Sequence, residues 1–278
     1  MAVNNRYFNK IIDIELLDTN NQIKSRIMTP RKGVKPQIEI TGNLISNDFV
    51  SMFEVRITNL YIDENVSYTA LRVYAGYEGQ KNIAIEGTIS NIYTETPGPD
   101  KVTVFMCTQA NIDAWNSKTV KLDFDKQFTA KDAVEQIATA LGFSAFIAAG
   151  VISPSKAPWN FNGLARSAVA ELRGLFPEVN IFIMNNTVFL YPGNYSIAKT
   201  YALPFLKSPA QFTGGGVSLV TVWDPAIKPN DFVTFPVNAY TKVIGALTSN
   251  KVKVISIAFA FDTAGDTNEM QITGALHA

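Results

Sequence analysis

Hydrophobic and polar residues alternate through most of the N-terminal third of the chain, with the period of two that is typical of half-buried β-strands. In the first such stretch, Ile12, Ile14 and Leu16 share one side. Asp13 and Glu15 are expected on the other side, facing solvent. A series of short strands separated by turns predicts a small β-barrel or sandwich. The later strands are expected at about Ile38–Ile40, Phe53–Ile57, Leu71–Ala75, Ile83–Ile89 and Val102–Met106, with turns at 76–79 and 97–100.

A basic segment, Arg26–Pro36, lies between the first two of these stretches. It contains two arginines and two lysines together with glycine and proline, which interrupt regular structure. The segment is therefore predicted to be an exposed loop. A solvated loop is the favoured interpretation, and contact with an acidic partner is the alternative.

The middle of the chain begins with a strand pattern at Val120–Phe124 and then changes to a helical one. Thr129 is a typical N-cap residue, and Val134, Ile137, Ala138 and Leu141 form a single apolar stripe. Gly142 follows the stripe and suits the C-terminal cap of a helix. A helix of about three turns is predicted between these caps.

A second helix and a hairpin complete this middle region. The helix is predicted at about Gly163–Leu175, after a loop at 153–159 that contains proline and serine, and Pro177 follows its end. Residues 179–191 form two short apolar runs around Asn185-Asn186, and asparagine tolerates the positive φ angles of a tight hairpin turn. The middle region is therefore predicted to be a small α+β domain.

The last stretch of the chain returns to a strand pattern. A β-branched run at Ser218–Trp223 is followed by the turn Lys228–Asp231 and a second run at Phe232–Phe235. A longer strand, Val252–Phe261, is predicted to meet Met270–Thr273 across a polar loop. These segments together predict a compact antiparallel β module.

Motifs in the first and last regions resemble a known family. Within residues 36–108 the chain reads EVRITNLY, then LRVYAGYEG, then IAIEGTISNIYTETPGPDKVTVFMC. Within the last region, a strand ends in Asp224-Pro225, the turn Lys228–Asp231 follows, and a hairpin precedes Gln271–Gly274. The order and spacing of these motifs are similar to those of phage tail and baseplate hub proteins, the tail-tube-like family that includes the late control D-like proteins.

This resemblance implies a mainly β (α+β) fold with three domains. Two tail-tube-like β-barrel domains, at 1–110 and 196–278, would flank a small α+β domain at 111–195. The resemblance also implies a structural virion protein without enzymatic activity. Three copies, a homotrimer, would form a baseplate hub, a ring of six similar domains that joins the tail tube to the central spike or tip complex and adapts sixfold to threefold symmetry.

The partners implied by the resemblance are the tail tube protein, the spike or tip protein, the tape-measure protein and other baseplate proteins. The hub would be assembled in the cytoplasm of the host bacterium and reside in the virion, where genome ejection would bring DNA through the ring without specific contacts. Because the chain ends soon after Gly274, any activity that degrades the cell wall is expected to belong to another protein.

Composition agrees with a protein that works through its interfaces. Hydrophobic residues make up 47% of the chain and charged residues only 17%, while 24 basic and 24 acidic residues give a net charge of zero. This balance argues against a broad surface for nucleic acid or anionic membranes. No apolar run approaches the roughly 18 residues of a membrane helix, and the N-terminus lacks the apolar core of a signal peptide. The many aromatic residues suggest surface that is buried against other subunits.

Few residues offer catalytic chemistry. The single histidine, His277, is the penultimate residue, and the single cysteine, Cys107, is expected to be buried in a strand. These counts argue against a histidine-based catalytic triad, a disulfide within the chain and a multi-cysteine metal site. The glycine run at 214–216 lacks the strand, helix and lysine context of a phosphate-binding loop and is interpreted as a connector.

Two acidic motifs could hold a cation. Asp123 and Asp125 have the spacing of a metal-binding pair, but strand alternation already places both on a polar face. The loop Asp262–Thr267 offers oxygen ligands for calcium, although it lacks the EF-hand pattern and serves equally well as a hairpin tip. The polar-surface interpretation is favoured for both, so no catalytic, cofactor-binding or metal-binding residues and no cofactors are predicted.

Two alternatives to a structural role remain open at this stage. One is a tail enzyme that acts on peptidoglycan or another glycan through a pair of carboxylates, which would meet only in the folded chain. The other is a module that binds a host glycan. Its candidate residues are the aromatic side chains of Trp115, Trp159 and Tyr195.

Overall fold

The computed structural model separates the chain into two compact units. The large unit comprises Met1–Ile45, Met52–Thr108 and Thr200–Ala278, and the small unit comprises Ser46–Ser51 and Gln109–Lys199. The residues that the structure describes are 10–28, 36–45, 51–60, 62–63, 65–77, 80–109, 112–151, 154–184, 186–192, 199–213, 216–236 and 250–276.

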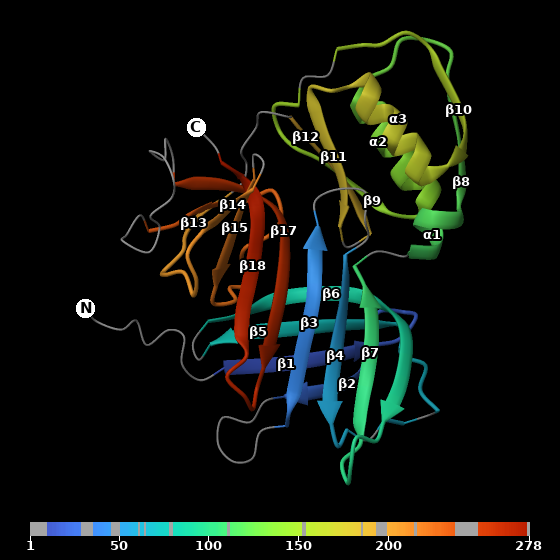
Figure 1. The fold of residues 1–278 in the computed structure, drawn as a ribbon. Helices are drawn as coiled ribbons and strands as arrows, with labels where there is room; N and C mark the ends of the chain where they lie inside the picture. Colours follow the sequence, from blue (N-terminus) through green and yellow to red (C-terminus); the bar gives the residue numbers. More distant parts are fainter. Residues whose placement is uncertain are drawn as a thin grey trace. The chain divides into compact units, whose positions relative to one another are not determined.

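The large unit is built on a single sheet of 13 described strands (Figure 1). The main path of the sheet runs in the order β14-β15-β18-β17-β3-β4-β7-β6-β5-β1-β2. Off this path, β16 pairs with β17, and β13 pairs with β16. The strands of the N-terminal part are β1 (Lys10–Leu17), β2 (Ile23–Met28), β3 (Ile38–Ile45), β4 (Met52–Thr58), β5 (Ala70–Tyr77), β6 (Gln80–Glu95) and β7 (Val102–Thr108). Those of the C-terminal part are β13 (Thr200–Ala202), β14 (Gln211–Thr213), β15 (Gly216–Thr221), β16 (Phe232–Thr234), β17 (Lys251–Asp262) and β18 (Asn268–Leu276).

Strand β3 from the N-terminal part of the chain pairs with strand β17 from the C-terminal part. They pair antiparallel from Ser256↔Ile45 to Asp262↔Glu39, and Figure 1 shows them side by side. The N-terminal and C-terminal segments therefore share one sheet. Among the described strands no closed barrel is found, so the arrangement as two barrel domains is not confirmed. The domain limits at 1–110, 111–195 and 196–278 stay a prediction.

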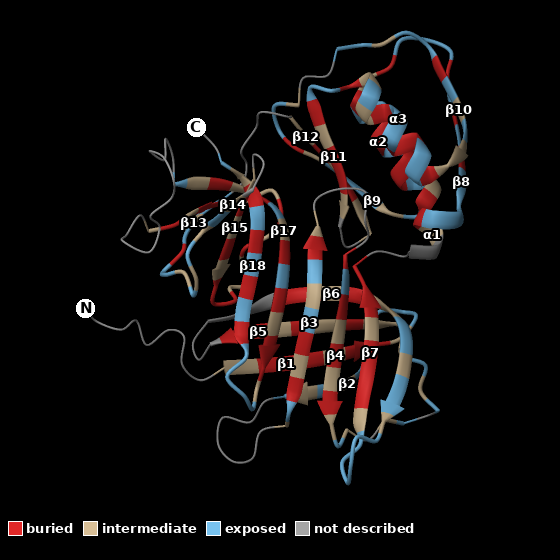
Figure 2. Ribbon diagram, in the orientation of Figure 1, coloured by how far each residue is buried: buried red, intermediate tan, exposed pale blue. Residues whose placement is uncertain are grey.

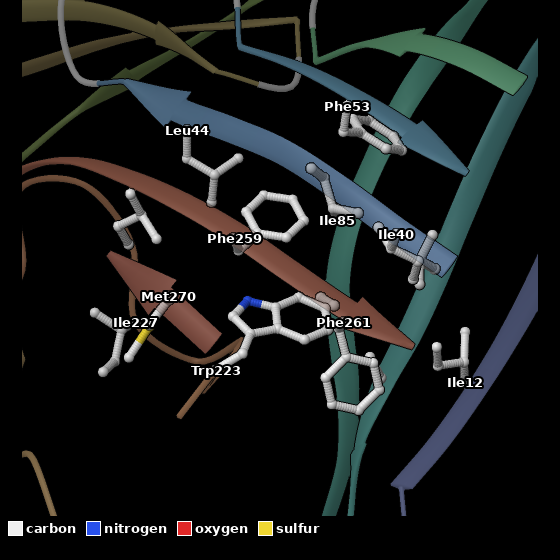
Figure 3. Packing of buried hydrophobic residues seen from close by; sticks show 14 of the residues in the cluster. Ile12, Ile40, Leu44, Phe53, Ile85, Trp223, Ile227, Phe259, Phe261 and Met270 are labelled. Carbon is white, nitrogen blue, oxygen red and sulfur yellow. The ribbon is translucent and has the colours of Figure 1, made fainter. Parts of the chain in front are cut away.

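Alternation along the strands builds one apolar core in the large unit (Figure 2). Figure 3 shows Trp223 at the centre of its C-terminal part. The Trp223 ring stacks on Phe259 with the ring centroids 5.2 Å apart, and Phe261 meets it edge-on at 4.8 Å. Burial of such large rings contributes strongly to stability because apolar area is removed from water.

The structure corrects two predictions about the N-terminal region. Asp13 is only 7% exposed and therefore does not lie on a solvent-facing side of β1. The basic segment does not begin as a loop, because Arg26 and the two residues after it belong to β2, which pairs with β1. The following residues, 29–35, lie outside the described part of the chain.

The small unit contains three helices and two small sheets among its described residues. Its elements are α1 (Ile112–Ser117), β8 (Thr119–Phe124), α2 (Ala130–Leu141), β9 (Ser144–Ile147), β10 (Trp159–Leu164), α3 (Ala165–Leu175), β11 (Val179–Met184) and β12 (Thr187–Pro192). One sheet pairs β10 with β8, and the other has the order β11-β12-β9.

The caps of α2 are those that the sequence predicts. Thr129 and Asp132 form a reciprocal capping box, and Gly142 ends the helix at φ 75°. The buried face of the helix includes the predicted stripe that ends at Leu141. The prediction of this helix is therefore confirmed at both ends.

The start of the second helix was predicted too early. Residues 159–164 are extended and pair with β8, with Trp159 opposite Phe124 and Leu164 opposite Thr119. Helix α3 therefore begins at Ala165. The hairpin of β11 and β12 is confirmed, and Asn186 in its turn has φ 53°. The sequence did not indicate α1 or the short strand β9.

We expect Gly87 to be required for the fit of Phe53 in the large core. A Cβ atom at position 87 would lie 2.6 Å from Cε1 of Phe53 and 2.5 Å from the carbonyl oxygen of Thr108, so β6 and β7 would have to move apart. Gly87→Ala should lower the free energy of unfolding by about 1–3 kcal/mol in denaturant titrations. Gly98→Ala is the matched control, because no atom lies within 4 Å of its Cβ, and a change above about 0.5 kcal/mol there would contradict this account.

Candidate functional site: paired charges and open sheet edges

The aromatic residues proposed for glycan binding do not form a surface site in the described residues. Trp115 and Trp159 are 3% and 9% exposed, and both belong to the core of the small unit. The indole N–H of Trp159 donates to Oε1 of Glu171 at 2.7 Å, and its ring stacks on Phe128. Tyr195 lies outside the described residues. The two tryptophans are therefore structural residues.

Other candidate residues fall in different places. Asp123 and Asp125 are exposed, on and directly after β8, as alternation predicted. Within the described ranges, no group of three or more histidine, cysteine or acidic residues could hold a metal ion. His277 and two of the three glycines at 214–216 lie outside those ranges, and Gly216 is the first residue of β15.

Cys107 is buried in β7, and this burial raises the pKa of its thiol above the ordinary value, so the thiol stays protonated and unreactive.

A lysine ammonium occupies the loop that the sequence offered as a calcium site. Nζ of Lys10, on β1, donates to the carbonyl oxygens of Gly265 at 2.8 Å and Thr267 at 3.0 Å. It also donates to Oδ1 of Asp262 at 3.3 Å. The Asp262 carboxylate additionally accepts from the backbone N–H groups of Gly265 and Thr267. The loop is thus a hairpin tip that holds the start of β1, and its oxygens are already hydrogen bonded to a cationic side chain.

The electrostatics of this contact favour the charged carboxylate. Burial by itself would raise the pKa of Asp262, but hydrogen bonds from the loop and the charge of Lys10 outweigh burial and lower the pKa below its ordinary value. The side chains of Lys10 and Asp262 are only 18% and 13% exposed, so solvent screens their attraction less than it screens a surface pair.

Lys228 forms a second link between the C-terminal segment and the N-terminal strands. Its backbone N–H and the Asp231 side chain close the predicted turn, in which Asn230 has φ 75°. Its Nζ donates to the carbonyl oxygen of Ala84 on β6. Burial lowers the pKa of Lys228 to about 8, against the opposing effect of the nearby carboxylates of Asp231 and Asp224.

Many carboxylates of the large unit are paired with arginines on neighbouring strands. Arg72 on β5 binds Glu86 on β6 at 2.9 Å and Glu15 on β1 at 3.3 Å, and Arg26 on β2 also binds Glu15. The hydrogen bond to Glu86 raises the pKa of Arg72 above its ordinary value. A similar cluster surrounds Arg56 on β4, which binds Glu54 on the same strand, Glu39 on the adjacent strand β3 and Glu95 on β6, two strands away. The pairs between adjacent strands help to hold those strands in register.

A shallow groove of about 530 Å³ lies between the connection that follows β4 and strands β6 and β7. Its lining mixes apolar and polar side chains, and the polar ones include Asp63 and Lys101. Oδ1 of Asp63 accepts hydrogen bonds from the backbone and side chain of Asn65. Asp63 is the one carboxylate among the described residues that line the groove, so these residues do not supply the carboxylate pair of the enzymatic alternative.

The main path of the large sheet has two open ends. In the part of the chain that the structure describes, β2 pairs with β1 and β14 pairs with β15, and neither strand has a partner on its other side. Strand β2 carries apolar side chains at both of its ends, with Ile23 39% and Met28 64% exposed. An open strand edge presents unpaired backbone N–H and C=O groups to another chain. No described helix is long and apolar enough to cross a membrane.

Comparison with known proteins shows similarity in structure alone. No protein-family model and no curated protein sequence matches the chain. A tail protein from Neisseria meningitidis matches with a TM-score of 0.63 and 8% identity, covering 97% of each chain. The 43 kDa tail protein of prophage MuSo2 from Shewanella oneidensis matches with a TM-score of 0.62 and 11% identity, covering 96% of this chain and 98% of its own.

A third match comes from a secretion system. The E. coli c3393 protein, a component of the type VI secretion system with structural similarity to the T4 tail proteins gp27 and gp5, has a TM-score of 0.60 and 9% identity. The match covers 90% of this chain and 75% of that protein. The chain therefore has the fold of phage tail proteins over nearly its whole length, and the resemblance predicted from its motifs is confirmed at the level of fold.

Removing the Lys10 side chain should weaken the large unit. Lys10→Ala leaves the carbonyl oxygens of Gly265 and Thr267 without this donor, and we expect a loss of about 1–3 kcal/mol in the free energy of unfolding. Lys24→Ala, which breaks a more exposed ion pair with Asp18, should cost less than about 1 kcal/mol. Equal losses in the two variants, measured by urea titration, would show that Lys10 is an ordinary surface lysine.

Lys228 should make stability depend on pH in the alkaline range. Its pKa is about 8 in the folded chain and 10.5 for an ordinary lysine, so the unfolded state binds more protons between these values. The stability of the wild type should therefore rise from pH 8 to pH 10.5 relative to Lys228→Met, by roughly 2–3 kcal/mol. Parallel pH profiles of the two proteins in thermal unfolding would contradict this expectation.

Proposed function

We propose that the chain is a structural protein of a phage tail, and that it acts as a baseplate hub. The observation that carries this proposal is the fold. The match to the Neisseria meningitidis tail protein covers 97% of each chain, and the match to the MuSo2 tail protein covers 96% of this chain and 98% of that protein. Paired carboxylates, buried tryptophans and a buried thiol give no support to the enzymatic or glycan-binding alternatives.

In the proposed hub, three copies of the chain form a ring that joins the tail tube to the central spike or tip complex. The two open ends of the large sheet support such an assembly. Strands β2 and β14 lie at opposite ends of the strand order, so each large unit has two different edges that could contact a neighbouring copy. A head-to-tail contact between different surfaces repeats around an axis and closes into a ring when the rotation permits. The tail tube, spike or tip, tape-measure and other baseplate proteins would be its partners in the virion.

The exposed side chains of β2 provide the test of this assembly. Analytical ultracentrifugation of the purified wild type should show a species of three times the 30.5 kDa chain mass. The double variant Ile23→Lys with Met28→Lys should shift it to monomer, because two charges placed in an apolar contact would have to be desolvated.

Met52→Lys is the matched control, since Met52 is 48% exposed on β4, inside the sheet rather than at its edge. This variant should keep the mass of the wild type. A wild-type protein that stays monomeric at high concentration, or a β2 double variant that stays trimeric, would contradict the proposed assembly.

A further inference from the structure

The three-stranded sheet of the small unit has two apolar faces. One face packs against helices α2 and α3 and includes Ile181 of β11, and Val188 and Leu190 of β12, all fully buried. Because side chains alternate along a strand, the residues between them project from the opposite face. That opposite face is also rich in large side chains, which is unusual for a sheet that already has a core on one side.

A row of aromatic rings crosses this second face. Phe182 on β11 is the register partner of Phe189 on β12, which is in turn the register partner of Phe146 on β9. The centroids of Phe182 and Phe189 lie 5.0 Å apart in a stacked arrangement, and those of Phe189 and Phe146 lie 5.5 Å apart. Tyr191 joins the row, 5.7 Å from Phe146 and 5.5 Å from Phe182. The four rings form a continuous aromatic surface.

Exposure of the aromatic row increases toward β9. Phe182 is 5% exposed, Phe189 is half-buried, and Phe146 is 43% exposed. The three strands read SAFI, VNIFIM and TVFLYP and contain no charged residue. Exposed aromatic side chains with few charges are typical of the centre of protein interfaces, whereas a phosphate-bearing ligand requires basic groups.

Strand β9, which carries the most exposed ring of the row, also has an open edge on the side away from β12. The N–H groups of Ser144 and Ala148 donate to the carbonyl oxygens of Asn186 and Leu190, so the even-numbered residues of β9 face β12. The N–H and C=O groups of Ala145 and Ile147 therefore point away from β12. Among the described strands, β9 has no neighbour on that side.

We propose that β9 and its exposed aromatic ring bind an extended, apolar segment of a partner protein, which adds to the sheet as a further strand. The added strand would hydrogen bond to Ala145 and Ile147, and its alternate apolar side chains would extend the row beyond Phe146. The open edge and the exposed ring lie on one strand, which is why a strand-forming segment fits better than a glycan or a nucleic acid. This inference does not depend on the proposed hub role.

Two substitutions separate the contributions of the backbone and the ring. Ala145→Pro removes an N–H that points away from β12, so it blocks the added strand while the bonds between β9 and β12 remain, and proline is tolerated at such edges. Phe146→Ser removes the exposed ring. Phe205→Ser is the control, because Phe205 is 45% exposed and lies in the large unit.

The experiment selects ligands for the full chain from a library of random short peptides displayed on yeast. We expect selected peptides to carry apolar residues at alternate positions. Their affinity should fall about tenfold or more for Ala145→Pro and for Phe146→Ser and stay unchanged for Phe205→Ser. Binding should also slow amide hydrogen exchange at Ala145 and Ile147, which a contact with the ring alone would not do.

Three results would overturn the inference. The first is a selection that yields no peptide specific for the wild type over Ala145→Pro. The second is peptide binding without protection of the Ala145 and Ile147 amides. The third is saturable binding of a neutral oligosaccharide such as chitohexaose that is lost in Phe146→Ser and kept in Ala145→Pro, because this pattern would make the face a glycan site.

Discussion

The pairing of β3 with β17 is the interaction on which the large unit depends. It places residues 39–45 beside residues 256–262, so segments at opposite ends of the chain become central neighbours in one sheet. Without this pairing, the N-terminal and C-terminal strands would each expose an edge and an apolar face. Among the described strands, the β3–β17 pairing joins the strands that carry the core around Trp223, Phe259 and Phe261 to those of the N-terminal part.

Charged side chains connect distant parts of the same unit. Lys10 and Lys228 each connect a C-terminal turn or loop with an N-terminal strand, through sequence separations of 252 and 144 residues. Arginines on β4 and β5 bind glutamates on the neighbouring strands. Such pairing uses charge to fix the register of adjacent strands.

Local patterns in the sequence predicted local structure well. Alternation and β-branched runs predicted most strands of the large unit but missed β2, β13 and β14, and the caps at Thr129 and Gly142 placed α2 correctly. The prediction was poorer where pairing with a distant strand decides the conformation. Residues 159–164 become β10 because they pair with β8, although Gly163 and Leu164 fit the start of a helical stripe. Strand β9 has only four residues and too little alternation to be recognised.

The same limit applies to the functional surfaces. No local signal connects Lys10 with the Asp262 loop, and the polar loop alone suggested a cation site. The tryptophans were chosen by residue type and lie in a core. In TVFLYP, Val188 and Leu190 alternate with Phe189 and Tyr191, and all four side chains are apolar or aromatic. This pattern could have indicated a second apolar face at Phe189 and Tyr191. Which strand edges remain open depends on the topology of the whole sheet, which no single segment reveals.

The most direct test of the central claim is the symmetry of the assembled particle. We would image the purified protein by electron microscopy and determine a map at a resolution that separates strands. The hub account predicts a threefold ring with an open centre in which β2 and β14 of each large unit lie at contacts between copies. A compact monomer, or a particle in which both of these edges face solvent, would contradict it.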